Sequence, residues 1–227
     1  MADTPSPSRT ALLAGATGLI GRALLTRLLA AAEYQRVIML VRRAASDIAA
    51  HAKLAVRTVD FANLPAPFPA VDDVYIALGT TIKTAGSQEA FRQVDFDYVV
   101  GVAGAARAAG ATRLAVVSAL GANAHSHVFY NRVKGEMQQA IAGLGYQTLV
   151  LAQPSLLVGD RAALGQPIRN AEVLVARLLR PVMGFVPKGV RPIAAGDVAA
   201  AMLKATLAGQ PGTRILGSGL MQGATRP

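Results

Sequence analysis

The stretch TALLAGATGLIGRALLTRLL, residues 10–29, decides the fold of this chain. Apolar residues 10–14 predict a short strand, the glycines at 15, 18 and 21 predict a tight turn, and residues 22–29 predict an amphipathic helix. A strand, a glycine turn and a helix form the first half of a nucleotide-binding βαβ unit, in which a pyrophosphate lies against the free N–H groups of the helix. The spacing G-x-x-G-x-x-G matches the usual G-x-G-x-x-G only in part, so a purely structural turn remains the alternative.

The rest of the chain alternates predicted strands with predicted helices. Further strands are expected at 36–41, 54–59, 73–78, 113–118, 147–152 and 213–216, and helices at 88–109, 129–142, 170–180 and 197–208. This alternation predicts an α/β fold with a doubly wound parallel sheet, a Rossmann fold. We expect a disordered tail at residues 1–8 and a single domain at 9–227, with residues 154–212 contributing a small C-terminal substrate cap.

Composition narrows the class of protein. Of the 227 residues 52% are hydrophobic, yet no apolar run approaches the ~18 residues of a membrane span. The absence of cysteine excludes disulfides and thiolate metal sites. The net charge of +10 is scattered and aromatic residues are 5%, which argues against nucleic acid and favours acidic small-molecule substrates and cofactors. We therefore expect a cytoplasmic protein with no membrane partner, and a homodimer is left open.

Two arginines indicate which nucleotide is bound. Arg42 and Arg43 follow the predicted second strand, where an NAD site usually carries an acidic residue. A guanidinium can bind a 2′-phosphate that a carboxylate would repel, so NADP(H) is favoured over NAD(H). Ordinary solvated arginines are the alternative. Asp60 and Phe61, after the third strand, could flank the adenine, although a strand-end cap explains them nearly as well.

A second set of residues predicts the chemistry. Ser118 ends the predicted fifth strand, and Tyr130 and Lys134 stand four residues apart on the following helix. Residues at i and i+4 share one helix face, so the ammonium can stabilise the phenolate while the serine hydroxyl holds a substrate oxygen. Surface and packing roles are the alternative for this common pair. His125 and His127 lie nearby without a third ligand, so no metal site is expected.

The motifs together resemble a known family. The glycine turn, Ser118 and residues 130–134 resemble the short-chain dehydrogenase/reductase superfamily in its atypical branch. Residues 77–81, 85–87, 94–95 and 153–160 are similar to small NAD(P)-binding oxidoreductases related to the human Tat-interacting protein. The similarity runs from residue 9 to about residue 216.

The resemblance implies a Rossmann fold and a set of NADP(H) contacts. The pyrophosphate would contact the glycine turn at Gly15, Thr17, Gly18, Leu19 and Ile20, beside Gly21. The ribose would be lined by Leu78 and Gly79, and the nicotinamide ribose would be bound by Lys134. The carboxamide would pack on Pro154, Ser155 and Leu156. The chain departs from the family pattern at two positions. Asp95 lies in the helix where typical relatives carry an asparagine, and Ala119 stands where relatives often carry a second serine.

These observations predict an NADP(H)-dependent oxidoreductase that transfers a hydride to or from a small carbonyl or alcohol, with Tyr130 as acid and base. Two alternatives remain open. One is an NADP(H)-binding sensor or scaffold with little turnover, and the other is a nucleotide-dependent epimerase or dehydratase.

Overall fold

The main sheet has seven strands, all parallel, in the order β3-β2-β1-β4-β5-β6-β9. The computed structural model describes residues 9–44, 48–158, 187 and 189–225. The strands are β1 (Arg9–Ala14), β2 (Tyr34–Val41), β3 (Leu54–Thr58), β4 (Asp73–Ile76), β5 (Arg113–Val117), β6 (Thr148–Gln153) and β9 (Gly212–Gly217). The predicted doubly wound α/β fold is confirmed, with strand ends displaced by at most two residues from those predicted.

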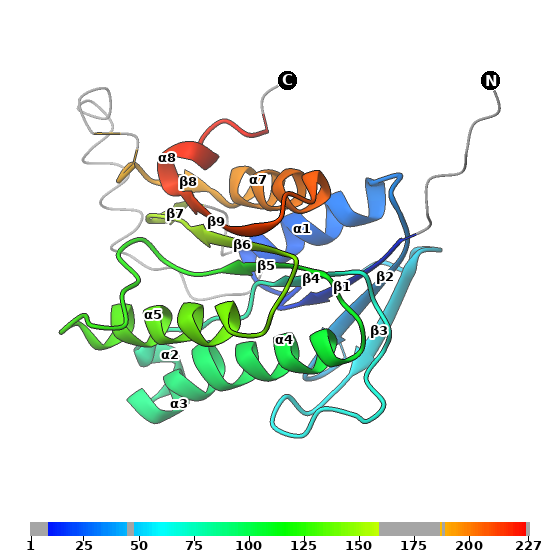
Figure 1. Ribbon diagram of the computed structural model, residues 1–227, viewed down its shortest axis with the longest axis horizontal. Helices are drawn as coiled ribbons and strands as arrows, with labels where there is room; N and C mark the ends of the chain where they lie inside the picture. The colour runs from blue at the N-terminus through cyan, green and yellow to red at the C-terminus, as the bar shows by residue number, and fades with distance from the viewer. Residues whose placement is uncertain (1–8, 45–47, 159–186, 188, 226–227) are drawn as a thin grey trace.

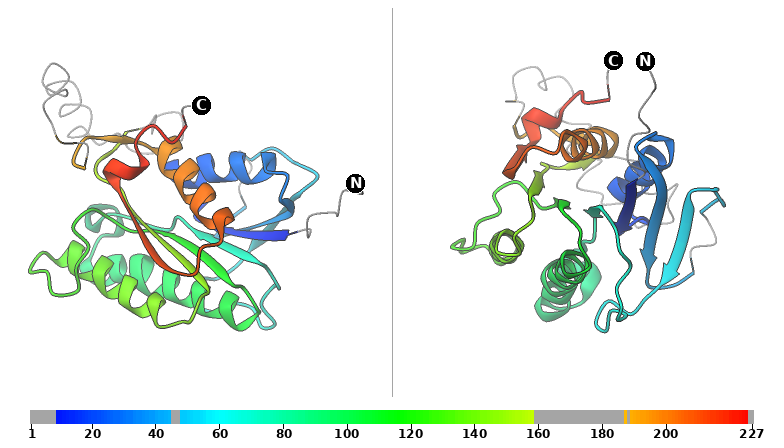
Figure 2. Two further views of the ribbon diagram at one scale, coloured as in Figure 1. Left: turned by 45° about the horizontal axis from the view of Figure 1, so that its top comes forward. Right: turned by 45° about the vertical axis from the view of Figure 1, so that its right-hand side comes forward.

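Helices cover both faces of the sheet (Figures 1 and 2). On one face lie α1 (Leu19–Ala30) and α7 (Ala195–Ala208), and on the other lie α4 (Tyr98–Ala108) and α5 (Phe129–Ala142). Because successive strand residues point to opposite faces, Leu13 and Met39 pack toward α1, whereas Leu12 and Ile38 pack toward α4. Both faces are therefore buried, which is why the strands read as continuous apolar runs.

The predicted helix at 88–109 is interrupted by a wider turn. It consists of α3 (Gln88–Arg92), a five-residue π-helical segment η1 (Gln93–Asp97) and α4. The short helix α2 (Ile82–Ala85) precedes it. A π-helical turn rotates the residues that follow it relative to an ordinary helix, and such turns are frequent at functional sites. Here the turn carries Asp95, which is 1% exposed.

More of the C-terminal part packs within the Rossmann core than the sequence predicted. Helix α7 packs beside α1, so this part of the expected cap at 154–212 belongs to the Rossmann core instead, and β9 completes the sheet. A small parallel pair, β7 (Leu157–Val158) and β8 (Ile193–Ala194), precedes α7, and α8 (Ser218–Met221) follows β9. The predicted helix at 170–180 and the predicted tail at 1–8 lie outside the described residues.

Candidate active site

The site lies where the sheet reverses its winding, at the carboxyl ends of β1 and β4. These strands are neighbours, with Ala14 opposite Ile76, although the chain passes through β2 and β3 between them. In open α/β sheets, ligands bind in the crevice at such a switch point. The glycine turn follows β1 here, and Leu78 and Gly79 follow β4.

Two of the three glycines are required by the fold itself. Gly15 has φ +90°, and a Cβ atom there would lie 2.5 Å from the carbonyl carbon and oxygen of Ala77. A Cβ atom on Gly21 would lie 1.9 Å from the carbonyl oxygen of Gly15. These glycines therefore allow the turn to press against β4 and α1 to press against the turn.

The middle glycine is different, because within the described part of the chain only one atom would lie within 4 Å of a Cβ atom built there. Gly18 has an ordinary extended backbone at φ −82° and ψ 170°. A Cβ atom there would find its nearest neighbour, the Gly15 carbonyl oxygen, at 3.6 Å. Gly18 caps α1, whose first turn contains no acidic residue, so no carboxylate of that turn offsets the positive end of the helix dipole. Thr17 is exposed beside it and Ile20 is buried beneath.

The residues expected at the adenine side separate into two roles. Asp60 accepts hydrogen bonds from the Asn63 side chain at 3.0 Å and from the Ala62 amide at 2.9 Å. These bonds, the one from Asn63 foremost, lower the pKa of the Asp60 carboxyl. Its carboxylate therefore forms hydrogen bonds within the local turn that follows β3. Arg42 and Arg43 follow β2 as predicted, and both are exposed.

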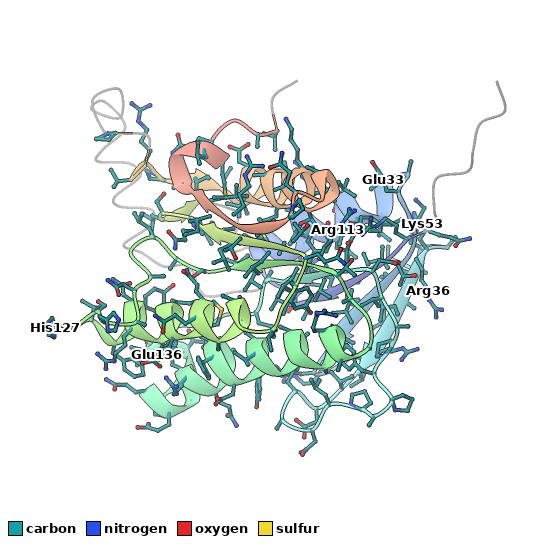
Figure 3. The ribbon with its side chains drawn as sticks, in the orientation of Figure 1. Glu33, Arg36, Lys53, Arg113, His127 and Glu136 are labelled. Atoms are coloured by element: carbon teal, nitrogen blue, oxygen red, sulfur yellow. The ribbon has the colours of Figure 1, made fainter. Side chains whose placement is uncertain are left out.

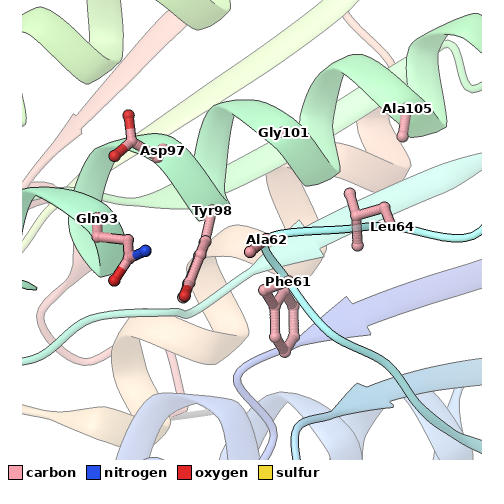
Figure 4. A pocket seen from close by; sticks show the side chains of 8 residues that line it. All are labelled: Phe61, Ala62, Leu64, Gln93, Asp97, Tyr98, Gly101 and Ala105. Atoms are coloured by element: carbon pink, nitrogen blue, oxygen red, sulfur yellow. The ribbon is translucent and has the colours of Figure 1, made fainter.

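Phe61 instead forms one wall of a cavity of about 460 Å³ beside α4 (Figure 4). Its ring packs on that of Tyr98, with centroids 5.8 Å apart. The lining is completed by Ala62, Leu64, Gln93, Asp97, Gly101 and Ala105.

A buried ion pair holds Lys134 in place. Its Nζ lies 2.8 Å from Oδ1 of Asp95, and the two side chains are 3% and 1% exposed. The second oxygen of Asp95 accepts the backbone N–H of Thr80 at 2.8 Å. A Cβ atom built on Gly79 would lie 3.4 Å from the carboxylate and 4.0 Å from the ammonium. The π-helical turn, the loop after β4 and α5 thus meet at this pair.

Ser118 is held by a chain of side-chain amides. Its backbone N–H donates to the Ala152 carbonyl at 2.7 Å, and its Oγ accepts a hydrogen bond from Nε2 of Gln138 at 2.5 Å. Oε1 of Gln138 in turn accepts from Nε2 of Gln153 at 3.2 Å. Ser118 is 4% exposed and follows β5, whereas Gln153 ends β6.

Tyr130 stands at the start of α5 and packs on Phe91, with ring centroids 5.4 Å apart. Residues 130, 134 and 138 are spaced at i, i+4 and i+8, so the tyrosine, the lysine and the glutamine occupy one face of the helix. The loop before α5 is pressed against it, because a Cβ atom on Gly135 would lie 2.1 Å from backbone atoms of that loop.

The histidines of this loop do not join the polar face of α5. Both His125 and His127 are exposed, and His127 projects outward beyond the end of α5, away from the sheet (Figure 3). Glu136, also labelled there, forms an ion pair with Arg92 across α5 and α3.

Residues 154–156 tie together the loops around the site. The carbonyl of Pro154 accepts the N–H of Leu120, and that of Leu156 accepts the N–H of Ile193, each at 2.9 Å. The hydroxyl of Ser155 donates to the Arg191 carbonyl and lies 2.8 Å from that of Ser218. The Ser155 side chain is therefore engaged within the protein.

Sequence reasoning missed Gln138 and Gln153 and recognised Asp95 only as a departure. The spacing of Gln138, eight residues after Tyr130 and four after Lys134, is the signal that could have found it. Gln153 could have been found by its position at a strand end, next to the end of β5.

Comparisons with known proteins identify the family and the fold. A family described as NAD(P)H-binding matches residues 15–153. The protein FMP52, mitochondrial, of Eremothecium gossypii is 36% identical to this chain over 66% of this chain and 67% of the relative. The protein fmp52, mitochondrial, of Emericella nidulans is 33% identical over 79% of this chain and 78% of the relative. An oxidoreductase of the short-chain dehydrogenase/reductase family from Burkholderia thailandensis superposes with a TM-score of 0.64 at 22% identity, over 94% of this chain and 93% of its own. The ADP-L-glycero-D-manno-heptose-6-epimerase of Helicobacter pylori superposes with a TM-score of 0.67 at 17% identity, over 95% of this chain and 79% of its own.

These comparisons also correct one expectation. The curated relatives are named as mitochondrial proteins, so the expected cytoplasmic location is wrong. Among the described residues, no helix is long and apolar enough to cross a membrane. The expected NAD(P)-binding domain is confirmed by the family match, and its expected Rossmann fold by the superposition on the solved structures. The chain belongs to the NAD(P)H-binding family and has its Rossmann-type domain.

Proposed function

We propose that this protein is an NADP(H)-dependent oxidoreductase that reduces a small carbonyl compound or oxidises the corresponding alcohol. The observation that carries the proposal is the polar face of α5, on which Tyr130 stands in line with the buried Lys134. Lys134 pairs with Asp95 beside the loop after β4, and the next residue of this face, Gln138, bonds Ser118 at the end of β5. This face supplies a proton donor, a fixed positive charge and a hydroxyl next to the switch point where a dinucleotide binds in such sheets.

The residues around the glycine turn fit a dinucleotide. The space beside Gly18 and the N-terminus of α1 suit a pyrophosphate, because the first-turn amides and the helix dipole both favour an anion. Thr17, Leu19 and Ile20 would line the same turn. The cavity walled by Phe61 suits an aromatic ring of the size of adenine.

The choice of NADP(H) over NAD(H) rests on Arg42 and Arg43. Both side chains are exposed directly after β2, where a guanidinium can form paired charge-assisted hydrogen bonds to a 2′-phosphate. Leu78 and Gly79 would face the ribose, and Pro154 and Leu156 the carboxamide.

In this mechanism the cofactor, when bound, supplies the hydride for the carbonyl carbon. Tyr130 donates its phenolic proton to the carbonyl oxygen, which gives the alcohol and leaves a phenolate that solvent reprotonates. The Ser118 hydroxyl donates a hydrogen bond to the same oxygen and so orients the substrate. The Lys134 ammonium, held by Asp95, stabilises the negative charge left on the phenol oxygen. In the reverse direction Tyr130 accepts the alcohol proton.

A second candidate is an epimerase, favoured by the fold it shares with the Helicobacter pylori enzyme. An epimerase would regenerate its cofactor within each turnover, whereas a reductase consumes it. Net consumption of NADPH therefore distinguishes the two activities.

The test is NADPH oxidation by the purified protein across a panel of aldehydes and ketones, compared with Tyr130→Phe. We expect the wild type to consume NADPH with at least one compound. Tyr130→Phe should bind NADPH with similar affinity and lose about 10²–10⁴ in rate, because only the phenolic oxygen is removed. A wild type that binds NADPH and reduces nothing on the panel would instead support the sensor or scaffold, and equal rates would refute the role of Tyr130.

A further inference from the structure

We infer that Gln138 is a positioning residue that fixes the Ser118 hydroxyl as a hydrogen-bond donor, and that Gln153 sets the orientation of Gln138. The inference rests on the proposed function, because the acceptor for the Ser118 proton is the oxygen of a carbonyl substrate. It assigns a task to two amides outside the serine, tyrosine and lysine of the proposed mechanism.

The direction of this chain of hydrogen bonds follows from which atom of each amide faces its neighbour. A serine hydroxyl has one proton to give and lone pairs to accept with. In the structure, Nε2 of Gln138 donates to Oγ of Ser118 at 2.5 Å, so that contact occupies a lone pair and leaves the proton available. The backbone of Ser118 is fixed independently by its N–H bond to the Ala152 carbonyl.

Gln153 determines which end of the Gln138 amide faces the serine. Its Nε2 donates to Oε1 of Gln138 at 3.2 Å, and this leaves Nε2 of Gln138 to point toward Ser118. If the Gln138 amide were turned over, its oxygen would draw the serine proton away from the substrate. Two neutral amides, one from α5 and one from the end of β6, thus keep the Ser118 hydroxyl as a hydrogen-bond donor toward the substrate.

The first test replaces the donor by an acceptor of the same shape, Gln138→Glu. An ionised carboxylate cannot donate, so the Ser118 hydroxyl should turn its proton toward it and carbonyl reduction should fall about 10- to 100-fold at pH 8. The dissociation constant of NADPH should not change. The loss relative to wild type should shrink toward pH 5, because partial burial beside Ser118 should raise the pKa of the introduced carboxyl above its usual ~4.3 and a protonated carboxyl group donates again. The matched control is Gln139→Glu, one residue along the same helix and exposed, which should keep wild-type rates at both pH values.

Two further variants separate orientation from packing. Gln138→Met leaves the hydroxyl free to rotate, so its loss should be smaller than that of Gln138→Glu. The hydrogen bond that the Gln153 side chain forms goes to Gln138, so Gln153→Glu tests the orientation of the Gln138 amide. The introduced carboxylate needs a donor, so it should turn the Gln138 amide over and reproduce both the loss at pH 8 and the recovery at pH 5.

A readout without cofactor or turnover is the side-chain amide resonance of Gln138 in the nitrogen–proton NMR spectrum of the free protein. Ser118→Ala should shift this resonance and leave that of Gln139 in place. An unchanged Gln138 resonance would overturn the hydrogen bond, and equal activity of Gln138→Glu and Gln139→Glu in an active wild-type background would overturn the inference alone. A Gln138→Met loss as large as that of Gln138→Glu would also overturn it. A wild type that reduces no carbonyl would overturn the proposed function and the inference with it.

Discussion

The buried pair of Asp95 and Lys134 gives a sharp prediction about what holds the site together. At a separation of 2.8 Å the attraction is about 6 kcal/mol for an effective dielectric constant near 20, and it offsets the cost of removing both charges from water. Replacing one partner leaves the other charge buried without compensation. We therefore expect Asp95→Asn and Lys134→Met each to lower the free energy of unfolding by about 3–5 kcal/mol.

The assay is urea unfolding of the cofactor-free protein, followed by circular dichroism, for both single variants and the double variant. For a chain of this length the loss corresponds to roughly 6–20 °C in melting temperature. The double variant should lose less than the sum of the singles by at least about 1 kcal/mol, because it buries no unpaired charge. The control is Glu136→Gln, which breaks the half-exposed pair with Arg92 and should cost no more than about 1 kcal/mol. Additive losses in the double variant, or single losses no larger than the control, would refute the reasoning.

Three further predictions concern the glycine turn and the nucleotide. Gly18→Asp should fold normally, because a Cβ atom fits at this position. It should weaken NADPH binding about 100-fold or more, since a carboxylate about 5 Å from one phosphate charge costs roughly 3 kcal/mol. Gly21→Ala should instead lower the melting temperature, because its Cβ atom would collide with the Gly15 carbonyl. Calorimetric titration and thermal melts check both, and normal binding by Gly18→Asp would contradict the pyrophosphate assignment. Replacing Arg42 and Arg43 by alanine should weaken NADPH binding about 10- to 100-fold and NADH binding much less. Equal weakening of the two cofactors would mean that the arginines do not contact the 2′-phosphate.

The strands and most helices could be predicted because their signals are local. The apolar runs that form β1, β2 and β6 are buried on both faces, and the residues of α5 agree with the predicted helix 129–142 at both ends. Strand–helix alternation then leaves few topologies. The glycine turn was predictable from its own spacing between a strand and a helix, and Gly21 meets the carbonyl of Gly15 only six residues before it.

The π-helical turn could not be predicted, because its cause is not local. Residues 93–97 have the composition of an ordinary helix, and an acidic residue in a helix usually indicates a solvated face. Asp95 is buried instead because Lys134, 39 positions later, and the Thr80 amide both bind its carboxylate. Only the tertiary structure brings these groups together.

The C-terminal part was misjudged for a related reason. Helix α7 was assigned to a cap because it follows Pro154 and a stretch without clear alternation. Its buried residues, among them Val198 and Met202, pack on the same side of the sheet as α1. A helix shows in sequence that it has an apolar face, but not which surface that face will cover. The expected cytoplasmic location was wrong for a different reason, because amino-acid composition does not indicate the compartment in which a protein works.

The central claim is tested most directly by the fate of the cofactor's hydrogen. The protein is incubated with NADPH carrying deuterium at the transferred position of the nicotinamide and with the carbonyl compounds on which it is most active, and the products are examined by mass spectrometry. We expect an alcohol with one deuterium on its carbinol carbon, formed in a one-to-one ratio with NADP⁺ and lost in Tyr130→Phe. An alcohol without deuterium, or the absence of any alcohol when NADPH is bound, would contradict it.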